Sequence, residues 1–197
     1  MTNRPRVILA STSAIRRKIL DGAGIEFTAM RPDADEEALK RGLENLAPPD
    51  LALALARAKA LSIKAPGALI IGADQIMEMD GEIFDKPRDR AEAAARLARC
   101  AGRAHRLING MAVAKDGAVV FENTDIARLT MRPMTQNEVG AYLDAAGEGA
   151  LTSVGAYQVE ALGSRLIERI DGDYFAVLGL SLFPLLGFLR REEALAW

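Results

Sequence analysis

Hydrophobic and polar positions form two alternating patterns along the chain. Short apolar runs, which are typical of buried strands, occur at 7–10, 25–30, 68–71, 107–114, 118–131 and 165–170. Between these runs, capping residues and apolar residues at helical spacing predict helices at about 14–21, 48–63, 89–101, 135–146 and 181–193. Strands that alternate with helices predict an α/β fold.

Turn residues indicate how the strands are connected. Asp80–Gly81 and Asp116–Gly117 each separate two strand-like segments, which is the pattern of a tight β-hairpin. Hairpins beside helix-connected strands predict a mixed sheet. No repeat or low-complexity linker divides the chain, so residues 1–197 are predicted to form a single domain.

Composition narrows the class of protein. The 197 residues carry a net charge of −2, and half of them are hydrophobic, which excludes disorder and argues against general nucleic-acid binding. The single cysteine, Cys100, cannot form an internal disulfide. The apolar stretch 174–189 is interrupted by Gly179 and Pro184 and is too short to span a bilayer. With no signal peptide visible, we expect a soluble cytoplasmic domain without a membrane partner.

The first candidate for chemistry follows the first strand. Ser11 and Ser13 precede a predicted helix whose first turn carries Arg16 and Arg17. Hydroxyl groups, free backbone N–H groups and guanidinium groups at a helix start can bind an anion. Taken alone, the same residues are more typical of an ordinary N-cap beside a solvated basic face.

Carboxylates and a lysine supply the other candidates. Asp74 follows the apolar run 68–71 and is expected at a strand end, where it could bind a hard cation, accept a proton or simply form a turn. The acidic segment 32–37 could complete a metal site with Asp74 or lie in solvent. Together with Lys86, and without cysteine or histidine ligands, these groups suggest metal–phosphate chemistry.

The only histidine, His105, begins a predicted strand, and no serine lies in a nucleophile-elbow motif. A serine hydrolase or a generic phosphatase that depends on His105 is therefore unsupported, and we interpret His105 as structural. Cys100, at the end of an alanine-rich helix, is interpreted as a small buried apolar residue.

The ordered motifs resemble those of the Maf family of nucleotide pyrophosphatases. Residues 9–17 are similar to the family's opening L-A-S-x-S-P-(x)-R-R, and 72–75 match its G-A-D-[TQ] segment. Further matching segments follow in family order at 32–36, 55–60, 80–83, 86–87, 155–163, 168–175 and 179–180. The resemblance therefore covers almost the whole chain.

This resemblance implies an elongated two-lobed fold similar to inosine-triphosphate pyrophosphatases, with the site in the cleft between the lobes. It implies a cytoplasmic homodimer that hydrolyses a nucleoside triphosphate to the monophosphate and pyrophosphate with Mg²⁺ or Mn²⁺. At the positions that match the family's motifs, Glu36 and Asp74 would bind the metal ion and orient a water molecule, and Asp74 would accept the proton of that water. The triphosphate would be held by Ser11, Ser13, Arg16, Arg17, Lys59 and Lys86, of which Lys86 also belongs to the catalytic set.

Three positions bear on base specificity. Gln75 and Glu160 resemble the branch that acts on 7-methyl-GTP rather than the branch that acts on pyrimidine triphosphates. A carboxylate at Glu160 can accept the two N–H donors of a guanine edge. Ile15 stands where the first branch has tryptophan, so a stacking partner for a cationic base is missing. The sequence favours a guanine-type substrate. The alternative to an enzyme is a non-catalytic, nucleotide-binding regulator of septum formation.

Overall fold

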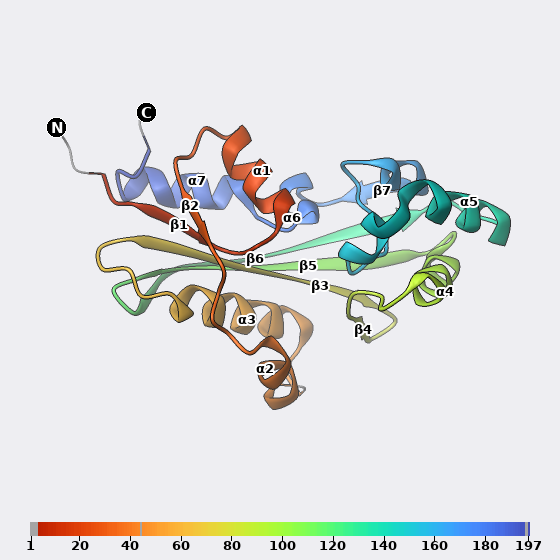
Figure 1. Cartoon of the computed structure of the whole chain (residues 1–197), viewed down its shortest axis with the longest axis horizontal. Helices are drawn as coiled ribbons and strands as arrows, with labels where there is room; N and C mark the ends of the chain where they lie inside the picture. Colours follow the sequence, from red (N-terminus) through yellow and green to blue (C-terminus); the bar gives the residue numbers. More distant parts are fainter. Residues whose placement is uncertain (1–3, 44, 196) are drawn as a thin grey trace. The chain divides into compact units, whose positions relative to one another are not determined.

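The computed structural model describes residues 4–43, 45–195 and 197. Within them, a seven-stranded sheet has the order β2-β1-β3-β5-β6-β7, and β4 pairs with β3 (Figure 1). The strands are β1 (Val7–Ala10), β2 (Thr28–Met30), β3 (Leu69–Met79), β4 (Glu82–Phe84), β5 (Ala104–Lys115), β6 (Ala118–Met131) and β7 (Ile167–Asp171).

Seven α-helices flank the sheet in the described part of the chain. They are α1 (Ala14–Gly22), α2 (Glu36–Gly42), α3 (Pro48–Ser62), α4 (Arg90–Cys100), α5 (Gln136–Ala146), α6 (Tyr174–Leu178) and α7 (Leu182–Arg191). Two 3₁₀ helices, η1 (Gly147–Thr152) and η2 (Leu162–Leu166), connect α5 to β7. The predicted mixed α/β fold is confirmed.

Strand pairing follows the predicted turn chemistry. β1 is parallel to both β2 and β3, whereas β4 is antiparallel to β3 and β7 is antiparallel to β6. At both predicted hairpins the aspartate and the glycine have positive φ, with values of 56° and 84° at Asp80 and Gly81, and 51° and 83° at Asp116 and Gly117. A two-residue hairpin of this type requires left-handed backbone at both positions, which Asp-Gly tolerates well.

Three predicted boundaries are wrong. β3 does not end at 71 but continues to Met79, because buried apolar residues resume after Gln75 and no turn residue intervenes before Asp80. The strand predicted at 25–30 is only Thr28–Met30, since the N–H of Ile25 still bonds to the end of α1. The acidic segment 32–37 is not wholly a connection: Asp35 caps α2, which begins at Glu36.

The chain divides into two compact units. Unit 1 contains the described residues up to Asp74 together with 109–125 and 179–197, and unit 2 contains 75–108 and 126–178. The single domain over 1–197 stays a prediction. Among the described residues, no helix combines the length and the apolar character needed to cross a bilayer.

In unit 1, α3 lies on one face of the strands, and α1 and α7 lie on the other (Figure 1). Glycines permit the close approach of α3. A Cβ at Gly72 would lie 2.6 Å from the backbone nitrogen of Ala60, and one at Gly110 would lie 2.6 Å from that of Leu53. Real Cβ atoms do not approach backbone this closely, so α3 can pack at this distance from the sheet only because both positions are glycine. The same close packing sets the distance of Lys59, a residue of α3, from the sheet.

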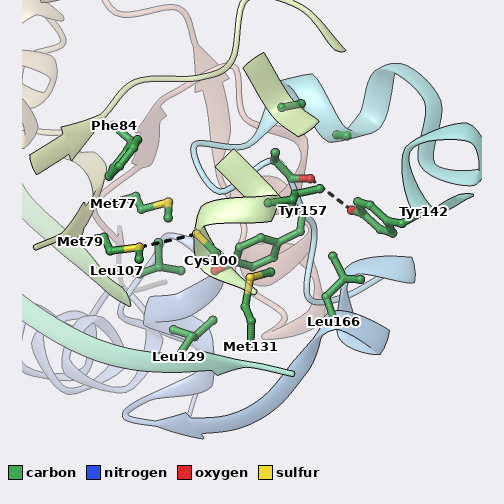
Figure 2. Packing of buried hydrophobic residues seen from close by; sticks show 14 of the residues in the cluster. Met77, Met79, Phe84, Cys100, Leu107, Leu129, Met131, Tyr142, Tyr157 and Leu166 are labelled. Atoms are coloured by element: carbon green, nitrogen blue, oxygen red, sulfur yellow. Dashed lines mark hydrogen bonds between the residues drawn. The ribbon is translucent and has the colours of Figure 1, made fainter. Parts of the chain in front are cut away.

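In unit 2, sulfur-containing and aromatic side chains pack together with aliphatic ones in the core (Figure 2). Cys100 is 1% exposed, and burial raises the pKa of its thiol to about 11. His105 is 2% exposed, its Nε2 hydrogen bonds with the hydroxyl of Tyr157, and burial lowers its pKa to about 4. Both residues are thus structural, as predicted.

Candidate active site

The site begins where β1 ends. Ser13 is the N-cap of α1 and accepts a hydrogen bond from the backbone of Arg16. The hydroxyl of Ser11 accepts from the backbone N–H of Ser13 at 3.2 Å and from Nη1 of Arg16 at 3.3 Å. Nε of Arg16 donates to the carbonyl of Gly179 at 2.7 Å. At the predicted N-cap, the hydroxyl of Ser11 and the guanidinium group of Arg16 are therefore in contact with each other.

Arg16 is electrostatically linked to two carboxylates. Burial lowers the pKa of its guanidinium, and the charges of Asp74 and Glu36 counteract part of that shift. Arg17 is different: it is exposed, and its Nη2 donates to the backbone carbonyl of Thr12 at 3.2 Å. Arg16 therefore interacts with the two carboxylates. Among the described residues, no contact of Arg17 with either carboxylate is found.

Lys59 connects those carboxylates directly. Its Nζ lies 2.7 Å from Oδ1 of Asp74 and 3.0 Å from Oε2 of Glu36. The side chains of Lys59 and Asp74 are only 8% and 10% exposed, whereas that of Glu36 is 44% exposed. Removing an ammonium and a carboxylate from water is costly unless they are paired, and here each is paired with the other. Three elements, α2, α3 and β3, meet at this one nitrogen.

Asp74 lies in the interior of β3, not at its end. β1 pairs with β3 as far as Ile71, and β4 pairs with it from Met77 onward, so Asp74 lies midway between the two partners. Side chains alternate along a strand, which places Asp74 on the same face as Gly72, the face covered by α3. The carboxylate of Asp74 therefore lies beyond the part of β3 that pairs with β1 and before the part that pairs with β4.

Asn109 is a site residue that the sequence analysis did not identify as functional. It is completely buried in β5, and its Nδ2 donates to the backbone carbonyl of Asp74 at 3.1 Å. Its Oδ1 accepts from the N–H of Ser181 at 3.2 Å and from the hydroxyl of Ser181 at 2.9 Å. A polar residue inside the apolar run 107–114 was the available signal.

For the other predicted site residues, no contact with this cluster is found among the described residues. Gln75 points to the opposite face from Asp74, and its Nε2 donates to the carbonyls of Ala176 and Val177 at 2.9 Å each. Lys86 and Glu160 are exposed, and both belong to unit 2. Ile15 is partly buried on α1. For these residues, the predicted roles stay predictions.

The donor set fits a hard divalent cation. Within the described residues, no group of three or more His, Cys, Asp and Glu side chains could hold a metal ion. The pair Glu36 and Asp74 nevertheless suits Mg²⁺, because Mg²⁺ is commonly held by one or two carboxylates, with water and substrate phosphates completing its shell. Their shared contact with one ammonium nitrogen shows that both carboxylates can face a single cation.

A guanidinium, an ammonium, two carboxylates and a serine hydroxyl beside the end of a parallel strand define a class of protein, the phosphate-handling α/β proteins. The comparison with known families is more specific. The family model "Maf-like protein" matches residues 6–192. The chain belongs to the Maf family.

Several relatives are similar over nearly their full length. A protein of Bradyrhizobium diazoefficiens named nucleoside triphosphate pyrophosphatase is 50% identical over 192 residues, which cover 96% of this chain and 95% of the relative. A protein of Rhodopseudomonas palustris with the same name is 47% identical over the same shares. A protein of Rhizobium etli named 7-methyl-GTP pyrophosphatase is 46% identical and covers 95% of this chain and 96% of its own.

Proposed function

We propose that this protein hydrolyses a nucleoside triphosphate to the nucleoside monophosphate and pyrophosphate. The observation that carries the proposal is the contact of Lys59 with both Asp74 and Glu36, beside Arg16 and Ser11. Cationic groups that neutralise a polyphosphate, next to carboxylates that can orient water and take its proton, are the parts this reaction needs. The names of the relatives support the same activity.

In the proposed mechanism, a water molecule attacks the α-phosphorus and transfers a proton to the carboxylate of Asp74. A bond forms between the water oxygen and the α-phosphorus, while the bond from that phosphorus to the α–β bridging oxygen breaks. The electron pair of the broken bond leaves with pyrophosphate. Arg16 and Lys59 stabilise the charge on the phosphates, and Ser11 donates its hydroxyl to a phosphate oxygen.

Two further features of the chain serve this geometry. Asn109 holds the backbone of Asp74 against the start of α7. Glu36 and Asp74 would hold Mg²⁺ or Mn²⁺, which when bound supplies positive charge to the phosphate oxygens. We include Ser13, Arg17 and Lys86 as additional triphosphate contacts. A homodimer in the cytoplasm completes the proposal.

For the base, we propose a guanine-type substrate, including 7-methyl-GTP. The support is Gln75 and the carboxylate of Glu160, which can accept from both N–H donors of a guanine edge. Ile15, the third member of the proposed specificity set, offers no aromatic face for a cationic base. Because the amide nitrogen of Gln75 is already bonded to α6, only its oxygen is available to a base. A panel of triphosphates assayed for pyrophosphate tests this choice, and fastest turnover of pyrimidine substrates would contradict it.

The function itself is tested with Asp74→Asn. We expect pyrophosphate release to fall by at least 100-fold, since an amide cannot accept the proton, while nucleotide affinity changes less than tenfold. Glu122→Gln is the matched control, because it neutralises a carboxylate of unit 1 that pairs with Arg57 on α3 and lies outside the site. Full activity of Asp74→Asn would refute the mechanism. Absence of pyrophosphate release from the wild-type protein would favour the nucleotide-binding regulator.

A further inference from the structure

Lys59 occupies the position between two carboxylates. Its Nζ is within 3.0 Å of both Asp74 Oδ1 and Glu36 Oε2, and the residue is 6% exposed. A Mg²⁺ ion binds its oxygen ligands at about 2.1 Å. An ion placed between these two oxygens on the side of Nζ would overlap with the ammonium group. The ammonium and the divalent cation cannot occupy this position together.

We propose that Lys59 is a built-in substitute for the divalent cation, and that a metal ion gains both carboxylates only after the polyphosphate has drawn the ammonium away. This inference rests on the proposed function. Metal and nucleotide then bind with positive coupling, and each raises the affinity for the other by the same factor.

Charge balance supports the exclusion of a free metal ion. The two carboxylates, Glu36 and Asp74, are matched by the two cationic groups of Lys59 and Arg16, so the cluster is formally neutral before any ligand binds. A neutral cluster attracts a hydrated divalent cation weakly. Arrival of a triphosphate makes the local charge negative and gives the ammonium group new acceptors.

The side chain can make this exchange without movement of its helix. α3 is held against the sheet by the close approach at Gly72 and Gly110, so the backbone of Lys59 is fixed. A lysine carries its compact charge on a flexible four-carbon stem, and rotation about those bonds is enough to move Nζ from a carboxylate to a phosphate. Arg16 is less free to act as the substitute cation, because its Nε is bonded to the carbonyl of Gly179.

The test measures the affinity of the nucleotide-free protein for Mn²⁺, and electron paramagnetic resonance of the unbound ion serves as the readout. We expect Lys59→Met to bind Mn²⁺ at least tenfold more tightly than the wild type, because the competing charge is gone. Lys59→Arg keeps a charge and is expected to bind as weakly as the wild type. Arg57→Gln is the matched control: it removes one charge from the same helix outside the site, and Mn²⁺ affinity should not change.

A second comparison begins with a variant that keeps Lys59, so its first part does not depend on the folding of Lys59→Met. If the ammonium fills the position, Glu36→Gln in the otherwise wild-type protein leaves nucleotide-free Mn²⁺ affinity unchanged. In the Lys59→Met background the same substitution abolishes the tenfold gain. A wild-type protein that binds Mn²⁺ tightly and loses that affinity with Glu36→Gln overturns the inference.

The two proposals fail differently. Pyrophosphate release by the wild-type protein reports on the function alone. If release is normal but Lys59→Met binds Mn²⁺ no better than the wild type, the substitute-cation role is wrong and the function stands. If release is absent while the Mn²⁺ results are as expected, the exclusion of free metal holds and the function is wrong.

Discussion

Replacement of Asn109 by leucine tests whether one buried amide holds the site together. The substitution keeps the branching of the side chain but removes three hydrogen bonds, one to the carbonyl of Asp74 and two from Ser181. Because Asn109 is 0% exposed, water cannot replace them. A buried polar group left without a partner costs about 1–3 kcal/mol. Allowing for relaxation of the Ser181 hydroxyl, we expect a loss of about 3–5 kcal/mol in the free energy of unfolding.

Equilibrium unfolding in urea, read by circular dichroism, measures this loss as a lower transition midpoint. Asn123→Leu is the matched control, since Asn123 is partly buried and its side-chain amide donates to Asp125, two residues away. This control should cost less than about 1 kcal/mol. Among molecules that remain folded, kcat is expected to fall more than KM rises, because Asn109 positions the carboxylate rather than the phosphates. A stability change for Asn109→Leu equal to that of Asn123→Leu would refute the reasoning.

Three further predictions concern packing and titration. Gly110→Ala should destabilise the protein by about 3 kcal/mol, because the new Cβ meets the backbone of α3, whereas Gly140→Ala, with no atom within 4 Å, should be neutral or stabilising in a urea titration. The pKa of His105 is about 4 in the folded protein and about 6.5 when unfolded, so the unfolded state binds more protons between these values and stability falls on acidification. From pH 7 to pH 5 the loss should be about 2 kcal/mol, and His105→Gln should abolish this slope. Burial raises the pKa of Cys100 to about 11, so an aromatic disulfide reagent at pH 8 should label it at least 100-fold more slowly than in guanidinium chloride.

Local signals in the sequence were sufficient for most of the secondary structure. The Thr135–Glu138 capping box is present in the structure, and β6 has the predicted bounds of 118–131. Such features depend on residues a few positions apart, which interact in the same way in any fold. α6 was not predicted, because five residues between Asp173 and Gly179 are too few to show a period.

The surroundings of Asp74 could not be predicted in the same way. The apolar run before it suggested a strand end, but the length of β3 is decided by its neighbours: β1 pairs with one part, and β4 with another. The contact of Asp74 with Lys59 depends on Gly72, whose missing side chain lets α3 approach. Neither the strand pairing nor this contact can be derived from the spacing of residues along the sequence. The resemblance to a family supplied the residue set, and the structure supplied the pairing within it.

This pairing has a consequence for how the activity is controlled. A carboxylate that has to accept a proton must be basic and must not be neutralised permanently by a neighbour. In this chain the neighbour is a lysine, whose charge can move, and not an arginine fixed by several bonds. The neighbouring Arg16 shows the contrast, since its guanidinium is already bonded to Ser11 and to the carbonyl of Gly179. Under the proposed function, the polyphosphate therefore exchanges the ammonium group on Oδ1 of Asp74 for the divalent cation, and the second carboxylate oxygen of Asp74 accepts the proton.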